Sequence, residues 1–255
     1  MAIIDIQNVS KTFEAGDSSG ELRVLRDISL SIEENEFICI LGPSGCGKST
    51  LLRIISGLEK ATGGNVTYRG ERVAAPRKEI GVVFQNYSLM PWLNVEDNIA
   101  LGLRFKHASE SEIQKTVSDY LQMIGMEQFR RSMPHELSGG MQQRVAIART
   151  LANDPDVVLM DEPFGALDAY TRIVLQKELL NIWEKHKKTI LFVTHSVDEA
   201  IYLADRIILM SRDCGKILRE DRVNLPRLRD RSDPEYARLT KELLEELERV
   251  NSTPR

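Results

Sequence analysis

The residues with the clearest chemical meaning are 42–50, which read GPSGCGKST and match the pattern G-x-x-x-x-G-K-[ST]. Glycines in this loop let successive backbone N–H groups turn toward one point, because no Cβ atom stands in the way. Lys48 can reach the β- and γ-phosphates of a nucleotide, and the hydroxyl of Ser49 can bind Mg²⁺. The pattern therefore predicts a site for a nucleoside triphosphate, and kinases, GTPases and transport ATPases all share it.

The elements that flank this loop must be a strand and a helix for the pattern to bind phosphate. Residues 36–41 form a short apolar, β-branched run that is typical of a buried strand. Leu51, Ile54, Ile55 and Leu58 recur at helical spacing after the loop. We expect this helix to direct the positive end of its dipole at the phosphates.

Four further polar side chains follow predicted strands. The apolar runs are 80–84, 157–160 and 189–194, and the side chains that follow them are Gln85, Asp161 with Glu162, and His195. Strands that alternate with helices favour a mainly parallel sheet, so we expect these groups to converge with Lys48 at one edge. Asp161 suits the metal and Glu162 the attacking water, because phosphoryl transfer depends on positioning and charge neutralisation. His195 can contact the γ-phosphate, and packing in the core is its alternative.

The N-terminal part of the chain predicts a small antiparallel β lobe. Residues 3–9 and 22–28 alternate partly between apolar and polar side chains and flank a polar stretch. Phe13 lies where this lobe turns, and its ring can either stack on a purine or pack within the lobe. The glycine pair at 63–64 predicts a turn that leads into a short strand over 65–68.

The middle of the chain is predicted to be a helical insertion in the α/β core. Helical patterns dominate from about residue 86 to 156. Ser109 with Glu112 forms a capping box for a helix that continues to about Ile124. A second helix is expected to begin after Ser138-Gly139-Gly140, within the run LSGGMQQR.

The remainder of the chain predicts three more helices. One spans about 169–186, and Ser196 with Glu199 caps the next. Asp233 and Pro234 provide an N-cap and a first helical position for an amphipathic C-terminal helix. We expect this last helix to pack on its own domain, and binding of a partner is the alternative.

Composition bounds the class of protein. A length of 255 residues with 42% hydrophobic and 28% charged residues suits one large α/β core or two modest domains. A net charge of −4 provides no basic field, so nucleic acid is not an expected partner. The sequence contains no signal peptide and no run of about 18 apolar residues, and its three cysteines lack metal-ligand spacing. We therefore expect a cytoplasmic protein.

The order of these motifs resembles that of the nucleotide-binding subunit of an ATP-binding cassette (ABC) transporter. The resemblance covers residues 3–220, and its run L-S-G-G-x-Q is highly specific to that family. The motifs are the loop 42–50, Gln85, LSGGMQQR at 137–144, Asp161-Glu162-Pro163, Ala166-Leu167-Asp168 and His195. The resemblance implies an α/β fold: a P-loop NTPase core with a mainly parallel sheet, an N-terminal antiparallel β lobe and an inserted α-helical subdomain. The cassette would span 1–220, the helical subdomain about 86–156, and a C-terminal extension with an amphipathic helix 221–255.

The resemblance also implies cofactors and residue roles. ATP and Mg²⁺ are the implied cofactors, with Ser49, Gln85 and Asp161 at the metal. Glu162 would be the catalytic base, with Gln85 at the water and His195 at the γ-phosphate. The implied ATP contacts are Phe13, Gly42, Pro43, Ser44, Gly45, Cys46, Gly47, Lys48, Ser49 and Thr50. A second copy, arranged head to tail, would contribute Ser138, Gly139, Gly140, Gln142 and Asp168 in trans.

A membrane-bound assembly follows from the same resemblance. Residues 87–93 (YSLMPWL) are unusually apolar for a loop, and such segments in the family accept a short helix of the membrane subunit. The alternative is that Trp92 plugs the helical subdomain. The implied partners are a second copy, transmembrane permease subunits and, indirectly, a periplasmic or lipid-anchored solute-binding protein. The chain would then lie on the cytoplasmic, inner face of the cell membrane.

The pair Pro91-Trp92 and the tail 225–231 (LPRLRDR) are similar to the nitrate, sulfonate and taurine importer subfamily. The leading hypothesis is therefore an ATPase that energises the import of such solutes. The alternatives are an importer of another small solute, an ABC-type ATPase that acts on DNA or ribosomes, and a metabolic kinase with the same loop.

Overall fold

The structure, a computed structural model, describes residues 2–14 and 20–252. The chain divides into two compact units. The first unit comprises residues 1–77 and 189–255, and the second comprises residues 78–188. Each unit is described by itself below.

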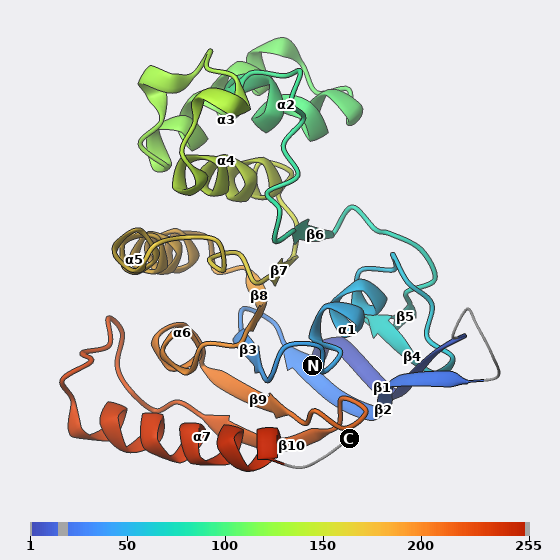
Figure 1. Cartoon of the computed structure of the whole chain (residues 1–255). Helices are drawn as coiled ribbons and strands as arrows, with labels where there is room; N and C mark the ends of the chain where they lie inside the picture. Colours follow the sequence, from blue (N-terminus) through green and yellow to red (C-terminus); the bar gives the residue numbers. More distant parts are fainter. Residues whose placement is uncertain (1, 15–19, 253–255) are drawn as a thin grey trace. The chain divides into compact units, whose positions relative to one another are not determined.

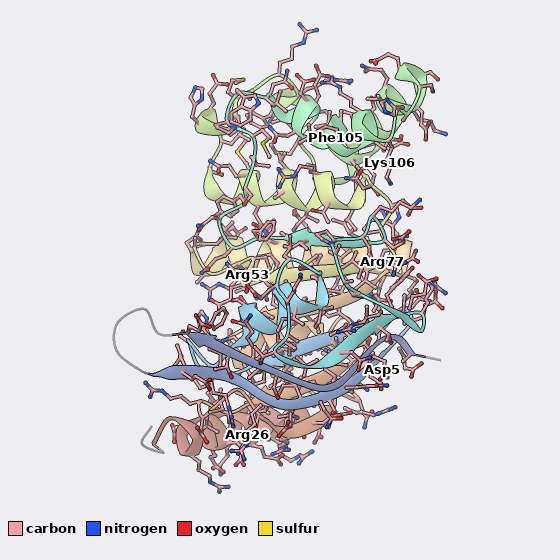
Figure 2. All side chains as sticks on the ribbon, turned by 90° about the vertical axis from the view of Figure 1, so that its right-hand side faces the viewer. Asp5, Arg26, Arg53, Arg77, Phe105 and Lys106 are labelled. Atoms are coloured by element: carbon pink, nitrogen blue, oxygen red, sulfur yellow. The ribbon has the colours of Figure 1, made fainter. Side chains whose placement is uncertain are left out.

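The first unit contains the predicted antiparallel β lobe (Figure 1). Its four strands lie in the order β2-β1-β4-β5, and each neighbouring pair is antiparallel. The strands are β1 (Ala2–Glu14), β2 (Glu21–Glu33), β4 (Gly63–Tyr68) and β5 (Glu71–Arg72). The apolar side chains of β1, such as Ile4 and Ile6, are buried, whereas Arg26 on β2 is exposed (Figure 2).

The glycine pair at 63–64 is an exception to the predictions, because it belongs to β4 and not to a turn before it. Gly64 has a positive φ of 73°, and a Cβ atom there would lie 2.3 Å from the carbonyl oxygen of Gln7. The pairing of β1 with β4 shifts register between Gln7 and Ser10. The glycine therefore allows close backbone approach at a bulge, which is the second common use of glycine within a strand.

The first unit also contains a second set of strands, in the order β10-β9-β3-β8. They are β3 (Phe37–Leu41), β8 (Thr189–Thr194), β9 (Arg206–Met210) and β10 (Ile217–Arg222). β3 pairs in parallel with both β8 and β9, and only β10 is antiparallel. Every residue of β3, β8 and β9 is buried, as expected for continuous apolar runs in a parallel sheet.

Three helices complete the first unit: α1 (Lys48–Ile55), α6 (Val197–Leu203) and α7 (Pro234–Ser252). The predicted cap of α7 is present, because the side chain of Asp233 accepts a hydrogen bond from the N–H of Glu235. Leu239 and Leu243 of α7 are buried, and α7 contacts α6 (Figure 1). The amphipathic helix thus packs on its own unit, as expected.

The second unit combines two parallel strands with four helices. The strands β6 (Ile80–Val83) and β7 (Val157–Asp161) pair directly. The helices are α2 (Val95–Phe105), α3 (Glu110–Met123), α4 (Gly139–Leu151) and α5 (Ala169–His186), with two short 3-10 turns at Glu127–Phe129 and Pro134–Glu136. Side chains of α2, α3 and α4, among them Ile99, Leu121 and Val145, form one buried core, which confirms the predicted helical subdomain as part of the fold.

Helix starts in both units follow the predicted caps. The hydroxyl of Ser109 accepts a hydrogen bond from the N–H of Glu112 at 3.3 Å, and that of Ser196 accepts one from Glu199 at 3.4 Å. Such caps supply a hydrogen-bond acceptor to one of the four N–H groups that lack a partner at the start of a helix. Within the described residues no helix is both long and apolar enough to cross a membrane.

We predict that Gly64→Ala destabilises the protein by about 2–5 kcal/mol, the sum of an unfavourable left-handed φ and a backbone clash. The matched control is Gly70→Ala, because Gly70 also has a positive φ but a Cβ atom there meets nothing within 4 Å. Gly70→Ala should therefore cost only the conformational part, about 1–2 kcal/mol. Urea denaturation of both variants measures the difference, and equal losses of stability would contradict this reading of β4.

Candidate functional site

The loop 42–50 joins β3 to α1, as its pattern requires. Gly45 and Gly47 have positive φ values of 76° and 100°, which side chains with a Cβ atom rarely adopt. A Cβ atom on Gly47 would lie 2.9 Å from the carbonyl oxygen of Val24, and one on Gly42 would lie 3.0 Å from that of Met210. The backbone of neighbouring segments therefore lies close to the loop at both glycines. A larger residue would fit at either position only if that backbone were displaced.

Lys48 is the first residue of α1, and it is only 3% exposed. Its Nζ donates hydrogen bonds of 2.9 Å to the carbonyl oxygens of Gly42 and Pro43. The ammonium group is thus held inside the curve of the loop that precedes it. Ser44 and Gly45, at the tip of the loop, are exposed.

His195 directly follows β8, just as the loop 42–50 directly follows β3. β3 and β8 pair in parallel with Leu41 opposite Thr194, so that Gly42 and His195 are the next residues along two adjacent strands. The side chain of His195 is exposed, which contradicts the alternative of a histidine packed in the core. The first unit therefore brings Lys48 and His195 to one edge of its parallel strands, as predicted.

Phe13 lies near the end of β1 and is 36% exposed, so its ring is not simply a core side chain. The Nζ of the buried Lys11 lies 4.5 Å from the centre of this ring, a cation–π distance. The same Nζ donates to Oε1 of Glu59 at 2.7 Å and to the carbonyl oxygen of Lys60 at 2.8 Å. Lys11, which the sequence did not indicate, therefore contacts the ring of Phe13. The exposed part of the ring remains accessible to a ligand.

In the second unit, Gln85 follows β6, and Asp161 is the last residue of β7 with Glu162 directly after it. These strands pair in parallel with Val83 opposite Met160, so the polar groups leave the same end of adjacent strands. A Cβ atom on Gly165 would lie 3.7 Å from Nε2 of Gln85 and 3.8 Å from Oε2 of Glu162. The amide and the carboxylate thus border the same small space.

The backbone at Glu162 is unusual, because its φ of 42° lies in the left-handed region. This conformation is uncommon for a residue with a Cβ atom, and such residues cluster at functional sites. Asp161 directly before it is 8% exposed. The strand β7 therefore ends on a buried carboxylate, and the chain continues at Glu162 with a left-handed backbone.

Ser138 is the N-cap of α4, and its exposed hydroxyl accepts a hydrogen bond from the N–H of Met141 at 3.4 Å. A Cβ atom on Gly140 would lie 2.7 Å from Cγ2 of Thr171 on α5, so glycine is required there for close packing. The side-chain amide of Gln142 donates to the carbonyl oxygens of Pro134 and Leu137 at 2.9 and 3.2 Å. Gln142 therefore fixes the turn that leads into Ser138.

Asp168 is the N-cap of α5 and accepts a hydrogen bond of 3.0 Å from the N–H of Thr171. Hydrogen bonds from the side chain and backbone of Thr171 lower the pKa of the Asp168 carboxyl below its usual value, because they stabilise the charged form. The carboxylate is exposed and ionised at neutral pH.

The first turns of the helices separate into two groups. The three helices that begin at predicted ATP residues, α1, α4 and α5, have no acidic residue in the first turn. The other four helices, α2, α3, α6 and α7, each have at least one there. Acidic side chains usually stabilise a helix N-terminus, so their absence favours an anion from outside the helix at the starts of α1 and α4, whereas the carboxylate of Asp168 already caps α5.

Arg149 and Tyr87 connect the segment after Gln85 to α4, and sequence reasoning missed both contacts. The guanidinium of Arg149 donates hydrogen bonds of 3.1 and 2.7 Å to the carbonyl oxygens of Tyr87 and Ser88. Tyr87 and Ser88 both have positive φ values, 47° and 50°. The hydroxyl of Tyr87 lies 3.0 Å from the position of a Cβ atom on Gly139. Neither of these two consecutive left-handed residues is a glycine, so the sequence did not indicate their conformation.

Three aromatic side chains of the second unit are exposed, those of Trp92, Phe105 and Tyr170. Trp92 is 70% exposed, so it does not plug the helical subdomain, and that alternative is wrong. Phe105, at the end of α2, is 77% exposed (Figure 2). Exposed aromatic rings are common at interaction surfaces, because their burial against a partner releases much apolar surface from water.

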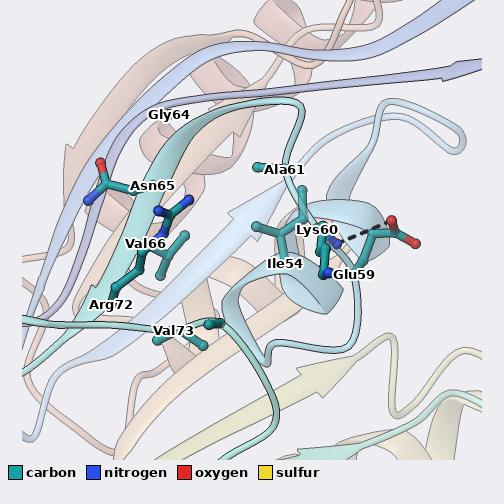
Figure 3. A pocket seen from close by; sticks show the side chains of 10 residues that line it. Ile54, Glu59, Lys60, Ala61, Gly64, Asn65, Val66, Arg72 and Val73 are labelled. Carbon is teal, nitrogen blue, oxygen red and sulfur yellow. Dashed lines mark hydrogen bonds between the residues drawn. The ribbon is translucent and has the colours of Figure 1, made fainter.

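A cavity of about 340 Å³ lies in the first unit but contains none of the predicted ATP residues (Figure 3). Its lining comes from the end of α1, the segment after it, and the strands β4 and β5. The lining residues are Ile54, Glu59, Lys60, Ala61, Gly64, Asn65, Val66, Arg72, Val73 and Ala74. The candidate site is therefore the loop and the strand ends, not this cavity.

The predicted site residues thus fall into two groups, one in each unit. The first unit contains Phe13, the loop 42–50 and His195, and the second contains Gln85, Asp161, Glu162 and the residues at the starts of α4 and α5. The predicted metal ligands Ser49, Gln85 and Asp161 supply only oxygen donors, which fit Mg²⁺. In the described part of the chain, no three His, Cys, Asp or Glu side chains cluster as a metal site.

Comparisons with known proteins point to one family. The family model described as ABC transporter matches residues 25–165. The chain is 46% identical over 246 residues to the aliphatic sulfonates import ATP-binding protein SsuB of Bacillus cereus, covering 96% of both chains. It is 45% identical over 249 residues to the nitrate import ATP-binding protein NrtD of Synechococcus elongatus, covering 94% of this chain and 90% of the relative.

A solved structure agrees with these relatives. The dimeric structure of a post-hydrolysis state of the ATP-binding cassette MJ0796, bound to ADP and Pi, matches with a TM-score of 0.77 and 37% sequence identity. The match covers 87% of this chain and 99% of the solved chain. The fold predicted from the sequence is therefore confirmed.

We predict that Gly165→Ala slows ATP hydrolysis roughly tenfold without unfolding the protein. The added methyl group would make ordinary contacts of 3.4–3.8 Å, so the fold should accept it. It would also occupy the space between Gln85 and Glu162, where a small misplacement of reacting groups is costly. Steady-state turnover and thermal unfolding measure the two effects, and Ala166→Gly is the control in the adjacent position. Normal turnover of Gly165→Ala would show that this space is not part of the reaction.

Proposed function

The chain belongs to the ABC transporter family, and we propose that it is the ATP-hydrolysing subunit that energises an importer of small oxyanions or sulfonates. Family membership and the match to a cassette bound to ADP and Pi make the chain an ATPase. The importing role rests on one observation. The similarity to import subunits for sulfonates and nitrate extends over almost the whole chain.

In this proposal the first unit holds the nucleotide. Backbone N–H groups of the loop 42–50 and the start of α1 bind the phosphates, and Lys48 adds a positive charge to the β- and γ-phosphates. The exposed ring of Phe13, supported from one side by Lys11, stacks on the adenine. Ser49, with Gln85 and Asp161, would hold Mg²⁺, which supplies charge neutralisation at the phosphates when it is bound.

The second unit supplies the groups that act on water. Glu162 accepts the proton of the attacking water, and the amide of Gln85, which borders the same space beside Gly165, orients that water. His195 contacts the γ-phosphate. The left-handed backbone at Glu162 supports this role, because such conformations cluster at functional sites.

The proposed site is completed by a second copy of the chain, arranged head to tail. Ser138, Gly139 and Gly140 at the start of α4 of one copy would cap the γ-phosphate that the loop of the other copy holds, with Gln142 and Asp168 beside them. The start of α4 lacks acidic residues, so it can accept this anion. ATP would then stabilise the closed dimer, and hydrolysis would remove that preference.

The membrane partners follow from the same proposal. The exposed Trp92 and its loop would accept a short helix of the permease subunits, which would place the chain on the cytoplasmic face of the membrane. A solute-binding protein would deliver nitrate, a sulfonate or taurine to the permease. Importers of other small solutes remain the alternative, because in this proposal the solute passes through the permease and not through this chain.

We also propose the division of the chain into a cassette over 1–220, with its helical subdomain at about 86–156, and an extension over 221–255. The compact units overlap this division only in part, since the second unit starts at residue 78 and includes α5. The extension is distinguished by its sequence and by its contacts with α6, which are described below.

We predict that Glu162→Gln lowers the rate of ATP hydrolysis by a factor on the order of 10² to 10⁴, because the base is lost while the phosphate contacts remain. Its affinity for ATP should stay within about twofold of the unmodified chain. Lys48→Ala should instead weaken ATP binding itself, and Glu184→Gln, at an exposed position of α5, is the matched control. Isothermal titration and phosphate release measure the two quantities. Unchanged turnover of Glu162→Gln would remove this residue from its proposed role.

We predict that Trp92→Ala abolishes uptake of labelled solute by cells that carry only this variant, while the purified variant keeps its ATPase activity. The reason is that the exposed indole would dock the permease and does not touch the phosphates. Phe105→Ala, which removes another exposed ring of the same unit, is the control and should transport normally. Nitrate, an alkanesulfonate and taurine are the solutes to test. Equal uptake of all three by a strain without the chain would contradict the proposed solute class.

A further inference from the structure

The segment between β10 and α7 carries three arginines at alternate positions, and all three contact α6 or its ends. These residues are Arg227, Arg229 and Arg231, within the run LPRLRDR. α6 is the short helix that starts just after His195, and α7 lies beside it (Figure 1). The role of this run is not explained by the site described so far.

Arg227 and Arg229 bind the carboxyl end of α6. Nη2 of Arg227 donates a hydrogen bond of 2.7 Å to the carbonyl oxygen of Leu203 and lies 2.8 Å from the carboxylate of Asp205. Nη1 of Arg229 donates to the carbonyl oxygen of Ile201. Carbonyl groups at the end of a helix lack partners within it and carry partial negative charge, so a guanidinium is a suitable cap.

Arg229 is buried, with only 5% of its surface exposed. Its other hydrogen bonds also go to backbone carbonyl oxygens, those of Val223 and Leu225. Burial lowers the pKa of its guanidinium to about 10, because it disfavours the charged form. A buried arginine is rare without a specific requirement, and here the requirement is the end of α6.

Arg231 binds the other end of α6. Its guanidinium donates two hydrogen bonds, of 2.7 and 2.9 Å, to the two carboxylate oxygens of Asp198 in the first turn. The hydroxyl of Tyr236 donates to the same carboxylate at 2.6 Å, and the guanidinium also lies 4.1 Å from the ring of Tyr202. A two-point contact of this kind fixes orientation as well as distance.

The first turn of α6 is in turn connected to His195. The N–H of Ser196 donates to Oγ1 of Thr194 at 3.0 Å, and that hydroxyl donates to the buried carboxylate of Glu199 at 2.5 Å. His195 lies between Thr194 and Ser196, so its backbone follows the position of this turn. A displacement of Asp198 would therefore be transmitted to the histidine through one turn of helix.

We propose that Arg231, together with Arg227 and Arg229, is a positioning residue that holds α6 so that His195 stays aligned for ATP hydrolysis. The inference rests on the proposed role of His195 and deepens it. The C-terminal extension then acts on the reaction through α6 without touching the nucleotide, and it does more than cover the sheet.

A double-mutant cycle with His195 tests this inference on the full-length chain. We expect Arg231→Met to lower kcat roughly tenfold, less than the about 10²-fold that a misplacement of 1 Å can cost, with KM for ATP within about twofold. Tyr236→Phe removes a second contact with Asp198 and should lower kcat less, in the same direction. In a His195→Ala background, Arg231→Met should cause no further loss, because both changes act on one group.

The control is Arg238→Met, which removes an arginine of α7 that pairs with Glu235 and Glu242 of its own helix, so kcat should be unchanged. Thermal unfolding of each variant identifies any loss of folded protein. Losses of kcat that multiply in the double variant, or a normal kcat of Arg231→Met, overturn the inference alone. A normal kcat of His195→Ala removes the proposed role of His195 and the inference with it.

Discussion

The loop 42–50 between β3 and α1 is the constraint on which the rest of this structure depends, because we propose that its backbone N–H groups bind a polyphosphate. Such a loop must curve tightly between a strand and a helix, and the segments around it must approach without side chains in the way. Cβ atoms on Gly42 and Gly47 would lie about 3 Å from the carbonyl oxygens of Met210 and Val24, and one on Gly215 would lie 2.6 Å from the carbonyl oxygen of Cys46. Segments from three parts of the sequence therefore support one loop, and the parallel register places His195 beside it.

A second constraint concerns charge at helix ends. The first turns of α1, α4 and α5 lack acidic residues, whereas those of α2, α3, α6 and α7 have them, and the start of α5 is capped instead by the carboxylate of Asp168. A chain that used the starts of α1 and α4 only for its own stability would gain by an acidic residue there. Their absence is consistent with an anion shared between two copies, in which α1 of one copy and α4 of the other bind the same phosphates.

Most of the fold could be predicted from the sequence because its signals are local. Continuous apolar runs identified β3, β6, β7 and β8, and serine caps located the starts of α3 and α6. The failures depend on contacts between distant segments. Gly64 serves a bulge against β1 and not a turn, and the hydrogen bonds of Arg149 and Arg231 join residues more than 30 positions apart. Likewise, periodicity alone could not reveal that Lys11 supports Phe13, since only the fold brings Glu59 to that lysine.

The central claim is that each ATP is bound by two copies of the chain, and sedimentation velocity of Glu162→Gln tests it most directly. The account predicts dimers with saturating ATP and monomers with ADP, and the added change Ser138→Arg, which fills the start of α4 with a bulky side chain, should prevent the dimer. Monomers at all concentrations of ATP, together with a wild-type turnover per chain that does not fall on dilution, would contradict the claim.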